Sequence, residues 1–165
     1  MPSILCIGGF ECPAKTIANC KQILKTIDIG TVKRNINGDL IKLRNSRKLW
    51  TSIICQDEYI PDLLTYEIGD TAQIGCIQRL WKKVTPEQTC ILKRRPYDKS
   101  VLGHNKKGDI IYSFEEQGGD QKLLIPKNVE FISYRPWVTI MITKIETTYQ
   151  DWDMKTEWRL EGEEV

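Results

Sequence analysis

The chain has 165 residues, of which 41% are hydrophobic and 28% are charged, and its formal net charge is +2 at pH 7. This is the composition of an ordinary globular protein, and the length favours one domain with a core of its own. No apolar run approaches the roughly 20 residues that span a bilayer, so we expect no membrane insertion. Residues 1–8 lack the basic and apolar segments of a signal peptide, and we expect assembly in the cytoplasm.

Charge is distributed unevenly along the chain. Residues 79–107 contain nine basic and two acidic side chains, a local charge of +7, whereas residues 144–165 contain three basic and seven acidic ones, a local charge of −4. Such runs are most often solvated surface. The alternative is a head-to-tail contact, in which the basic segment of one copy meets the acidic end of the next, as closed rings require.

The N-terminal half predicts three strands: a short apolar one at 3–10, and two with residues assigned to opposite faces at 49–57 and 71–81. Gly8-Gly9 permits a sharp change of direction in the first strand, and Gly75 suggests a bulge in the third. Residues 13–29 fit either a helix or an edge strand, and we favour an extended or mixed conformation.

Residues 31–43 contain the clearest turn signal. Asn37-Gly38 separates two alternating runs and can supply the two positive φ angles of a type I′ turn. We therefore predict a hairpin in which Val32 lies opposite Leu43.

The pattern dissolves after residue 81. Residues 82–109 contain prolines, glycines and many basic side chains without periodicity, which predicts an extended loop or arm. Residues 110–114 and 122–125 flank a polar stretch that contains two glycines, and they predict a second hairpin.

Residues 134–161 predict two long strands joined by a short polar turn, and they hold three of the five tryptophans. In the second strand Met154, Thr156, Trp158 and Leu160 alternate with charged side chains, as in a strand with one buried and one wet face. The first strand is apolar on both sides of the pleat from Trp137 to Ile142. That pattern fits a sheet covered on both faces or a contact with another subunit.

About eight or nine short strands without long helices predict a mainly β fold, an antiparallel β-sandwich or barrel with long hairpins and an arm-like loop. We expect a single domain over residues 1–165, with 82–109 as the arm.

The sequence contains no recognisable catalytic or metal-binding constellation. It lacks a phosphate-binding loop, a nucleophile elbow and a zinc-protease motif, and none of its six cysteines are spaced C-x2-C. The single histidine, His104, falls in the loop-like segment, where we expect it to be mobile. Cys55 and Cys76 lie on apolar strand faces and are interpreted as small buried hydrophobes. We therefore expect no enzyme activity, no metal and no cofactor.

The candidate interaction residues are aromatic, apolar or basic. Trp152 lies at a turn between charged residues, where it is hard to bury and suits an interface anchor. The two-sided strand and the basic segment supply the others. We predict a subunit interface from these residues: Trp137, Ile140, Ile142, Trp152, Lys93, Arg94 and Arg95.

A nucleic-acid-binding β-barrel is the alternative function. Basic residues interleaved with Trp81 and Tyr97 could contact phosphates and bases. This hypothesis predicts that Lys83, Arg94 and Arg95 lie on one concave face beside Trp81. The weak overall charge argues against it, and so does the absence of aromatic residues on an alternating basic strand.

Several blocks of the chain share features with one family: Ile7-Gly8-Gly9-Phe10, Ile27-Asp28-Ile29-Gly30 followed by Arg34-Asn35-Ile36-Asn37-Gly38, Arg135-Pro136-Trp137-Val138-Thr139-Ile140-Met141-Ile142, the Asp151-Trp152 turn and Trp158-Arg159-Leu160-Glu161-Gly162-Glu163-Glu164-Val165. Spread over most of the chain, they resemble the small structural tail proteins of tailed bacteriophages. The abundance of cysteine and the basic middle segment depart from the family pattern.

The resemblance implies a non-enzymatic subunit at the tail tip, the baseplate or a tube joint. Such proteins build rings from β-sandwich or barrel cores, with hairpins and arms that reach their neighbours. It further implies that the partners are other tail proteins and further copies of this chain, and that the protein resides in the virion. From the charge and the placement of the aromatic residues, we do not expect nucleic acid to be a partner.

Overall fold

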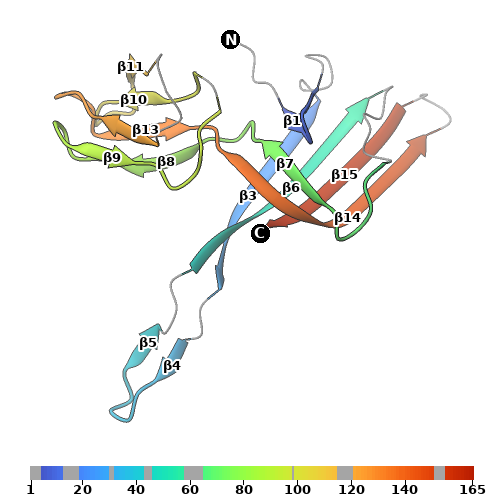
Figure 1. Ribbon diagram of the computed structural model, residues 1–165, viewed down its shortest axis with the longest axis horizontal. Coiled ribbons are helices and arrows are strands. Elements are labelled where there is room, and N and C mark those ends of the chain that lie inside the picture. The colour runs from blue at the N-terminus through green and yellow to red at the C-terminus, as the bar shows by residue number, and fades with distance from the viewer. Residues whose placement is uncertain are drawn as a thin grey trace. The chain divides into compact units, whose positions relative to one another are not determined.

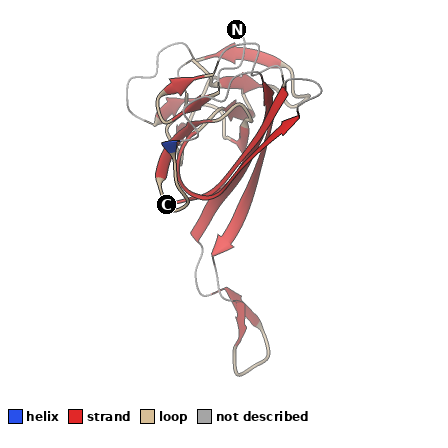
Figure 2. Cartoon of the chain, turned by 90° about the vertical axis from the view of Figure 1, so that its right-hand side faces the viewer, coloured by secondary structure: helices blue, strands red, loops and turns tan. Residues whose placement is uncertain are grey.

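The computed structural model describes residues 5–12, 19–29, 32–42, 46–57, 65–97, 99–114, 121–150 and 155–165. These residues are mainly strands, with a short 3₁₀ turn at Thr65, drawn in blue in Figure 2, and no α-helix among them. The strands are β1 (Cys6–Ile7), β2 (Phe10–Glu11), β3 (Cys20–Ile29), β4 (Val32–Arg34), β5 (Leu40–Lys42), β6 (Ser46–Asp57), β7 (Thr71–Gly75), β8 (Leu80–Lys83), β9 (Thr89–Ile91), β10 (Leu102–His104), β11 (Ile110–Ser113), β12 (Lys122–Leu124), β13 (Phe131–Tyr134), β14 (Trp137–Gln150) and β15 (Lys155–Glu164).

The strands form one seven-stranded sheet and three smaller sheets. The large sheet has the order β2-β1-β7-β14-β15-β6-β3, and its long strands lie side by side in Figure 1. The smaller sheets are β11-β10-β13-β8, β12-β9 and β4-β5. The pairings are antiparallel. The prediction of a mainly β, antiparallel fold of the sandwich type is confirmed.

The chain divides into two compact units. Unit 1 comprises residues 1–18 and 73–138, and unit 2 comprises residues 19–72 and 139–165. Each unit has buried apolar residues of its own. The structure thus shows two cores where the sequence analysis expects one domain.

In unit 2, strands β14 and β15 form the long hairpin that the sequence predicts. Thr156, Trp158 and Leu160 are buried while Glu157 is exposed, which confirms the alternation. Among the described residues, the two-sided burial predicted for β14 is not found. The side chains of Ile140 and Ile142 are buried, whereas Met141, on the other face of the strand, is 43% exposed.

β14 and β15 approach each other closely at Gly162. The pairing shifts by one residue between Ile142 and Lys144, a β-bulge. A Cβ atom at Gly162 would lie 2.5 Å from Ile140 Cδ1 and 2.7 Å from the Met141 carbonyl oxygen. Only glycine fits there, because a side chain would have to displace backbone.

Strand β3 is an edge strand of unit 2, as one reading of the sequence proposes. It pairs with β6 along its whole length, from Cys20 opposite Cys55 to Ile29 opposite Ser46. Cys55 is buried as expected, but it also forms a disulfide with Cys20. The sequence analysis does not anticipate this bond, because residues 35 positions apart become neighbours only through the ladder.

The hairpin at residues 32–42 exists, but its predicted register and turn type are wrong. Val32 pairs with Lys42 instead of Leu43. The Gly38 N–H donates to the Asn35 carbonyl (3.0 Å) and the Asn35 N–H to the Asp39 carbonyl (2.9 Å). Gly38 has φ +84°, whereas Asn37 is not among the described residues with positive φ. This is a three-residue loop, a type I turn closed by a glycine bulge, and the extra residue shifts the register.

In unit 1, residues 82–109 are not an arm. They contain β9, β10 and part of β8, and they contribute Cys90, Leu92 and Val101 to the hydrophobic core. His104, expected in a mobile loop, is buried on β10. The sequence pattern misses these strands because each spans only three or four residues, too short to show a period.

The second predicted hairpin is also wrong. β11 pairs with β10, and β12 pairs with β9, so residues 110–114 and 122–125 do not pair with each other. Leu123 on β12 lies opposite Cys90, and both side chains enter the core. β11 and β12 are neighbours in the sequence, but each pairs with the strand beside which its side chains pack better.

Candidate interaction sites

The start of β14 joins the segment around Tyr97. The Trp137 N–H donates to the Arg95 carbonyl (2.8 Å), and the Tyr97 N–H donates to the Arg135 carbonyl (2.7 Å). The rings of Tyr97 and Trp137 stack with centroids 5.0 Å apart and planes 26° from parallel. Both rings are half-buried, so one part of the stack faces solvent.

Tyr97 also contacts two charged side chains. The Arg135 guanidinium lies 5.1 Å from the centre of its ring, and its hydroxyl donates to Glu11 Oε1 at 3.3 Å. Burial raises the pKa of Tyr97, and the negative charge of Glu11 raises it further. Gly75 makes room for the ring, because a Cβ atom there would lie 2.8 Å from Tyr97 Cε2. The sequence analysis interprets Gly75 as a bulge and misses this contact.

A second group of polar contacts in unit 1 joins Arg79, Ser133 and His104. Arg79 Nε donates to Ser133 Oγ (3.0 Å), and Ser133 Oγ lies 2.7 Å from His104 Nε2. His104 Nδ1 lies 3.0 Å from the Gly108 carbonyl, which can only accept, so this nitrogen carries the proton and Nε2 accepts from Ser133. Trp81 is exposed, and the centroid of its ring lies 4.4 Å from the centroid of the His104 ring.

This serine and histidine do not form an accessible nucleophile. Ser133 is fully buried, and its oxygen already accepts a hydrogen bond from Arg79. The arrangement therefore satisfies buried polar groups and ties β10 to β13.

The seven predicted interface residues fall into different places. Ile140 and Ile142 are buried in unit 2, so their side chains are covered by this chain itself. Trp137 is half-buried and joined to the exposed Arg95 through its backbone. Lys93 is exposed, Arg94 is half-buried, and Trp152 lies outside the described residues.

The residues of the nucleic-acid hypothesis are only partly brought together. Trp81 and Lys83 lie two residues apart on β8, on the same side of the strand, and both are exposed. The ring against Trp81 is that of His104, whereas Arg95 is joined to Trp137.

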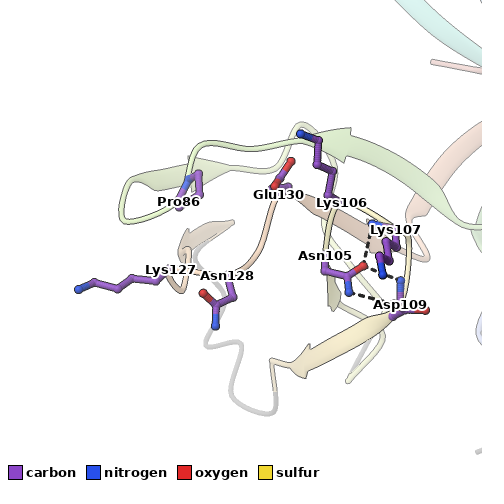
Figure 3. A pocket seen from close by; sticks show the side chains of 8 residues that line it. All are labelled: Pro86, Asn105, Lys106, Lys107, Asp109, Lys127, Asn128 and Glu130. Atoms are coloured by element: carbon purple, nitrogen blue, oxygen red, sulfur yellow. Dashed lines mark hydrogen bonds between the residues drawn. The ribbon is translucent and has the colours of Figure 1, made fainter.

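A shallow pocket of about 410 Å³ opens in unit 1 (Figure 3). Its lining residues are polar or charged: Pro86, Asn105, Lys106, Lys107, Asp109, Lys127, Asn128 and Glu130. Figure 3 shows Lys106 and Lys127 pointing in different directions, so the lysines do not converge on one ligand. Asn105 and Asp109 are engaged in a turn.

That turn repeats the one at residues 35–39. Asn105 Oδ1 accepts from the N–H groups of Lys107 and Asp109, both at 2.9 Å, and Asn105 Nδ2 donates to Asp109 Oδ2 at 2.9 Å. Asn35 makes the same three hydrogen bonds with the corresponding residues of its loop. Both loops have the sequence Asn-x-x-Gly-Asp, a signal that the sequence analysis overlooks.

The hairpin of β4 and β5 exposes large apolar side chains. Ile36 at its tip is fully exposed, and Leu40 and Ile41 are 66% and 42% exposed. The two strands form a sheet of their own. Apolar surface of this kind favours a partner.

Within the described residues, no helix is long and apolar enough to cross a membrane, and no three His, Cys, Asp or Glu side chains are placed to hold a metal ion. Comparison of the chain with known protein families and with curated proteins found no match.

Proposed function

We propose that this protein is a non-enzymatic structural subunit of a bacteriophage tail, at the tail tip, the baseplate or a tube joint. It assembles with further copies of itself and with other tail proteins, and it resides in the virion. The observation that carries the proposal is the exposed apolar surface of the β4–β5 hairpin.

A two-stranded hairpin is only marginally stable alone, so three exposed aliphatic side chains on it favour burial against another surface. Burying each of them contributes roughly 1.5–3 kcal/mol. The family resemblance supports the same use of a hairpin, as an arm that contacts a neighbouring subunit.

A second surface supports assembly. Trp, Tyr and Arg are the residue types that dominate interface energies, and the half-exposed stack of Tyr97 and Trp137 lies beside Arg135. The basic segment at 79–107 and the acidic segment at 144–165 provide opposite charges for a contact between copies.

The test is the mass of the purified protein, measured by light scattering after gel filtration at several concentrations and at low and high salt, followed by negative-stain electron microscopy. We expect rings or a salt-sensitive oligomer. The variant Ile36→Ser, Leu40→Ser, Ile41→Ser should shift the protein toward the monomer, because it removes the apolar contact.

The matched control is Ile68→Ser with Leu124→Ser, which changes two apolar residues outside the hairpin that are 71% and 74% exposed. It should assemble like the wild type. A wild-type protein that stays monomeric at high concentration, or a hairpin variant that assembles unchanged, contradicts the proposal.

The competing function is binding of single-stranded nucleic acid, favoured by the exposed Trp81, at 58%, with Lys83 on the same side of β8. It predicts that a fluorescent oligonucleotide binds and that affinity falls with salt. Trp81→Ala should then weaken binding, and Lys83→Ala should reduce the salt slope by about one. Rings without oligonucleotide binding favour the tail subunit.

A further inference from the structure

The loop at the tip of the β4–β5 hairpin contains the pair Asn37-Gly38. Of the six asparagines in the chain, only Asn37 is followed by glycine. Glycine has no Cβ atom, so no side chain shields the backbone nitrogen of Gly38 or restricts its approach to the Asn37 side chain. That nitrogen and the Asn37 Cγ atom are the two partners of an intramolecular reaction.

The surroundings of the pair leave it open to water. Both residues are exposed, and a Cβ atom at Gly38 would have no neighbour within 4 Å. The Asn37 backbone N–H donates to Asn35 Oδ1 (2.9 Å), whereas its side-chain amide makes no hydrogen bond with a described residue. The Asn35 amide, by contrast, is held by three hydrogen bonds. The Asn37 side chain is therefore free to turn toward Gly38.

One hydrogen bond stands against the reaction. The Gly38 N–H donates to the Asn35 carbonyl (3.0 Å), and this bond must open before the nitrogen can attack. Strands β4 and β5 form a sheet of only two strands, which is marginally stable by itself. Such a hairpin opens locally while the rest of the chain stays folded. The folded protein therefore releases this nitrogen repeatedly.

We propose that Asn37 is a site of deamidation in the folded protein, made reactive by local opening of its hairpin. The Gly38 nitrogen loses its proton to solvent and attacks Asn37 Cγ. The new N–Cγ bond closes a five-membered imide ring, the Cγ–Nδ2 bond breaks, and the amide nitrogen takes up a proton and leaves as ammonia. Water then opens the ring at either carbonyl group, which leaves an aspartate or an isoaspartate at position 37. Oxidation states do not change, so water is the only co-reactant.

Each product changes the tip of the hairpin. Both carry a new negative charge next to the fully exposed Ile36. The isoaspartate also lengthens the backbone by one carbon atom, which disturbs the hydrogen bonds of Asn35 across the loop. The reaction does not depend on the tail function, because it needs only this chain and water.

The experiment incubates the purified full chain at neutral and at mildly alkaline pH, and follows each asparagine by peptide mapping with mass spectrometry. Isoaspartate is identified by enzymatic methylation of its α-carboxylate. We expect Asn37 to deamidate at least tenfold faster than Asn105 and Asn128. The rate should rise with pH, because the attacking nitrogen must lose its proton. Asn37→Gln, for which the ring would need six members, should lose its amide at least tenfold more slowly.

The second loop of the same sequence pattern provides a matched control. Lys107→Asn places an asparagine before Gly108, in a turn with the same hydrogen bonds but within a sheet of four strands. In urea, both Asn-Gly pairs of this variant should react at similar rates. In the folded variant, the pair at 107 should react at least tenfold more slowly than Asn37-Gly38, because its hairpin is anchored. The comparison separates the effect of the structure from that of the sequence pair.

The proposal is overturned if Asn37 of the folded wild type reacts no faster than Asn105 and Asn128. It is also overturned if the introduced pair at 107 reacts as fast as Asn37-Gly38 in the folded variant, since local opening of the β4–β5 hairpin would then not be the cause.

Discussion

Tyr97 has a different neighbour at each part of its side chain: Trp137 stacks on the ring, Arg135 lies over it, and Glu11 accepts from the hydroxyl. Burial is the largest cause that raises its pKa above 10.0, followed by the charge of Glu11. The folded protein thus retains the proton at a pH where the unfolded chain loses it. The stability contributed by Tyr97 is complete below pH 10 and is lost as the pH rises through the folded pKa.

We therefore expect the free energy of unfolding to fall as the pH rises above about 10, and to fall less steeply in Tyr97→Phe. Chemical denaturation across this range measures the slope. Tyr149→Phe, a change at an exposed tyrosine, is the control and should behave as the wild type. Parallel curves for the wild type and Tyr97→Phe would refute the linkage.

At the level of elements, one turn sequence closes two hairpins with different surroundings. Asn105 closes the turn between β10 and β11, within a sheet of four strands, whereas Asn35 closes β4 and β5, a sheet of two. Each asparagine oxygen accepts from two N–H groups and takes the place of backbone acceptors. The same three hydrogen bonds therefore close one hairpin that belongs to a four-stranded sheet and one that forms a two-stranded sheet by itself.

Asn105→Ala should lower the global stability by about 1–2 kcal/mol, because two N–H groups lose their acceptor in a cooperative sheet. Asn35→Ala should leave global unfolding nearly unchanged and only speed hydrogen exchange in its own hairpin, since that hairpin opens locally. Asn128→Ala, at an exposed asparagine of unit 1, controls for loss of the amide. Equal losses of global stability for Asn35→Ala and Asn105→Ala would show that the hairpin unfolds only with the whole chain.

At the level of the whole molecule, the chain forms two units and passes between them three times. Each unit therefore consists of two separate stretches of the sequence. Ile132 belongs to the core of unit 1, and Leu160 is buried in unit 2. Separate cores imply separate local stabilities, even where strands β7 and β14 continue from one unit to the other.

Ile132→Ala and Leu160→Ala should each destabilise by about 2–5 kcal/mol, because each leaves a cavity in a core. Hydrogen exchange should rise first in unit 1 for the former variant and first in unit 2 for the latter. Ile68→Ala, at an exposed position, should change neither. A uniform rise in exchange over both units in both variants would mean that the chain unfolds as one.

The sequence by itself determined the β class, the β14–β15 hairpin and the burial of Trp158 and Leu160, since alternation with a period of two follows from the covalent geometry of a strand. It also marked the hairpin around Gly38, although one additional loop residue changed the register. Alternation states which side of a strand is buried, but it does not state which strand covers it.

Only the tertiary structure decided that β11 pairs with β10, that His104 is buried, and that Ser100 accepts hydrogen bonds from the Arg79 side chain and from the Arg135 backbone. These contacts join residues far apart in the chain, where no period or spacing connects them. They depend on the packing of short strands around a shared core, and that packing is a property of the folded chain as a whole.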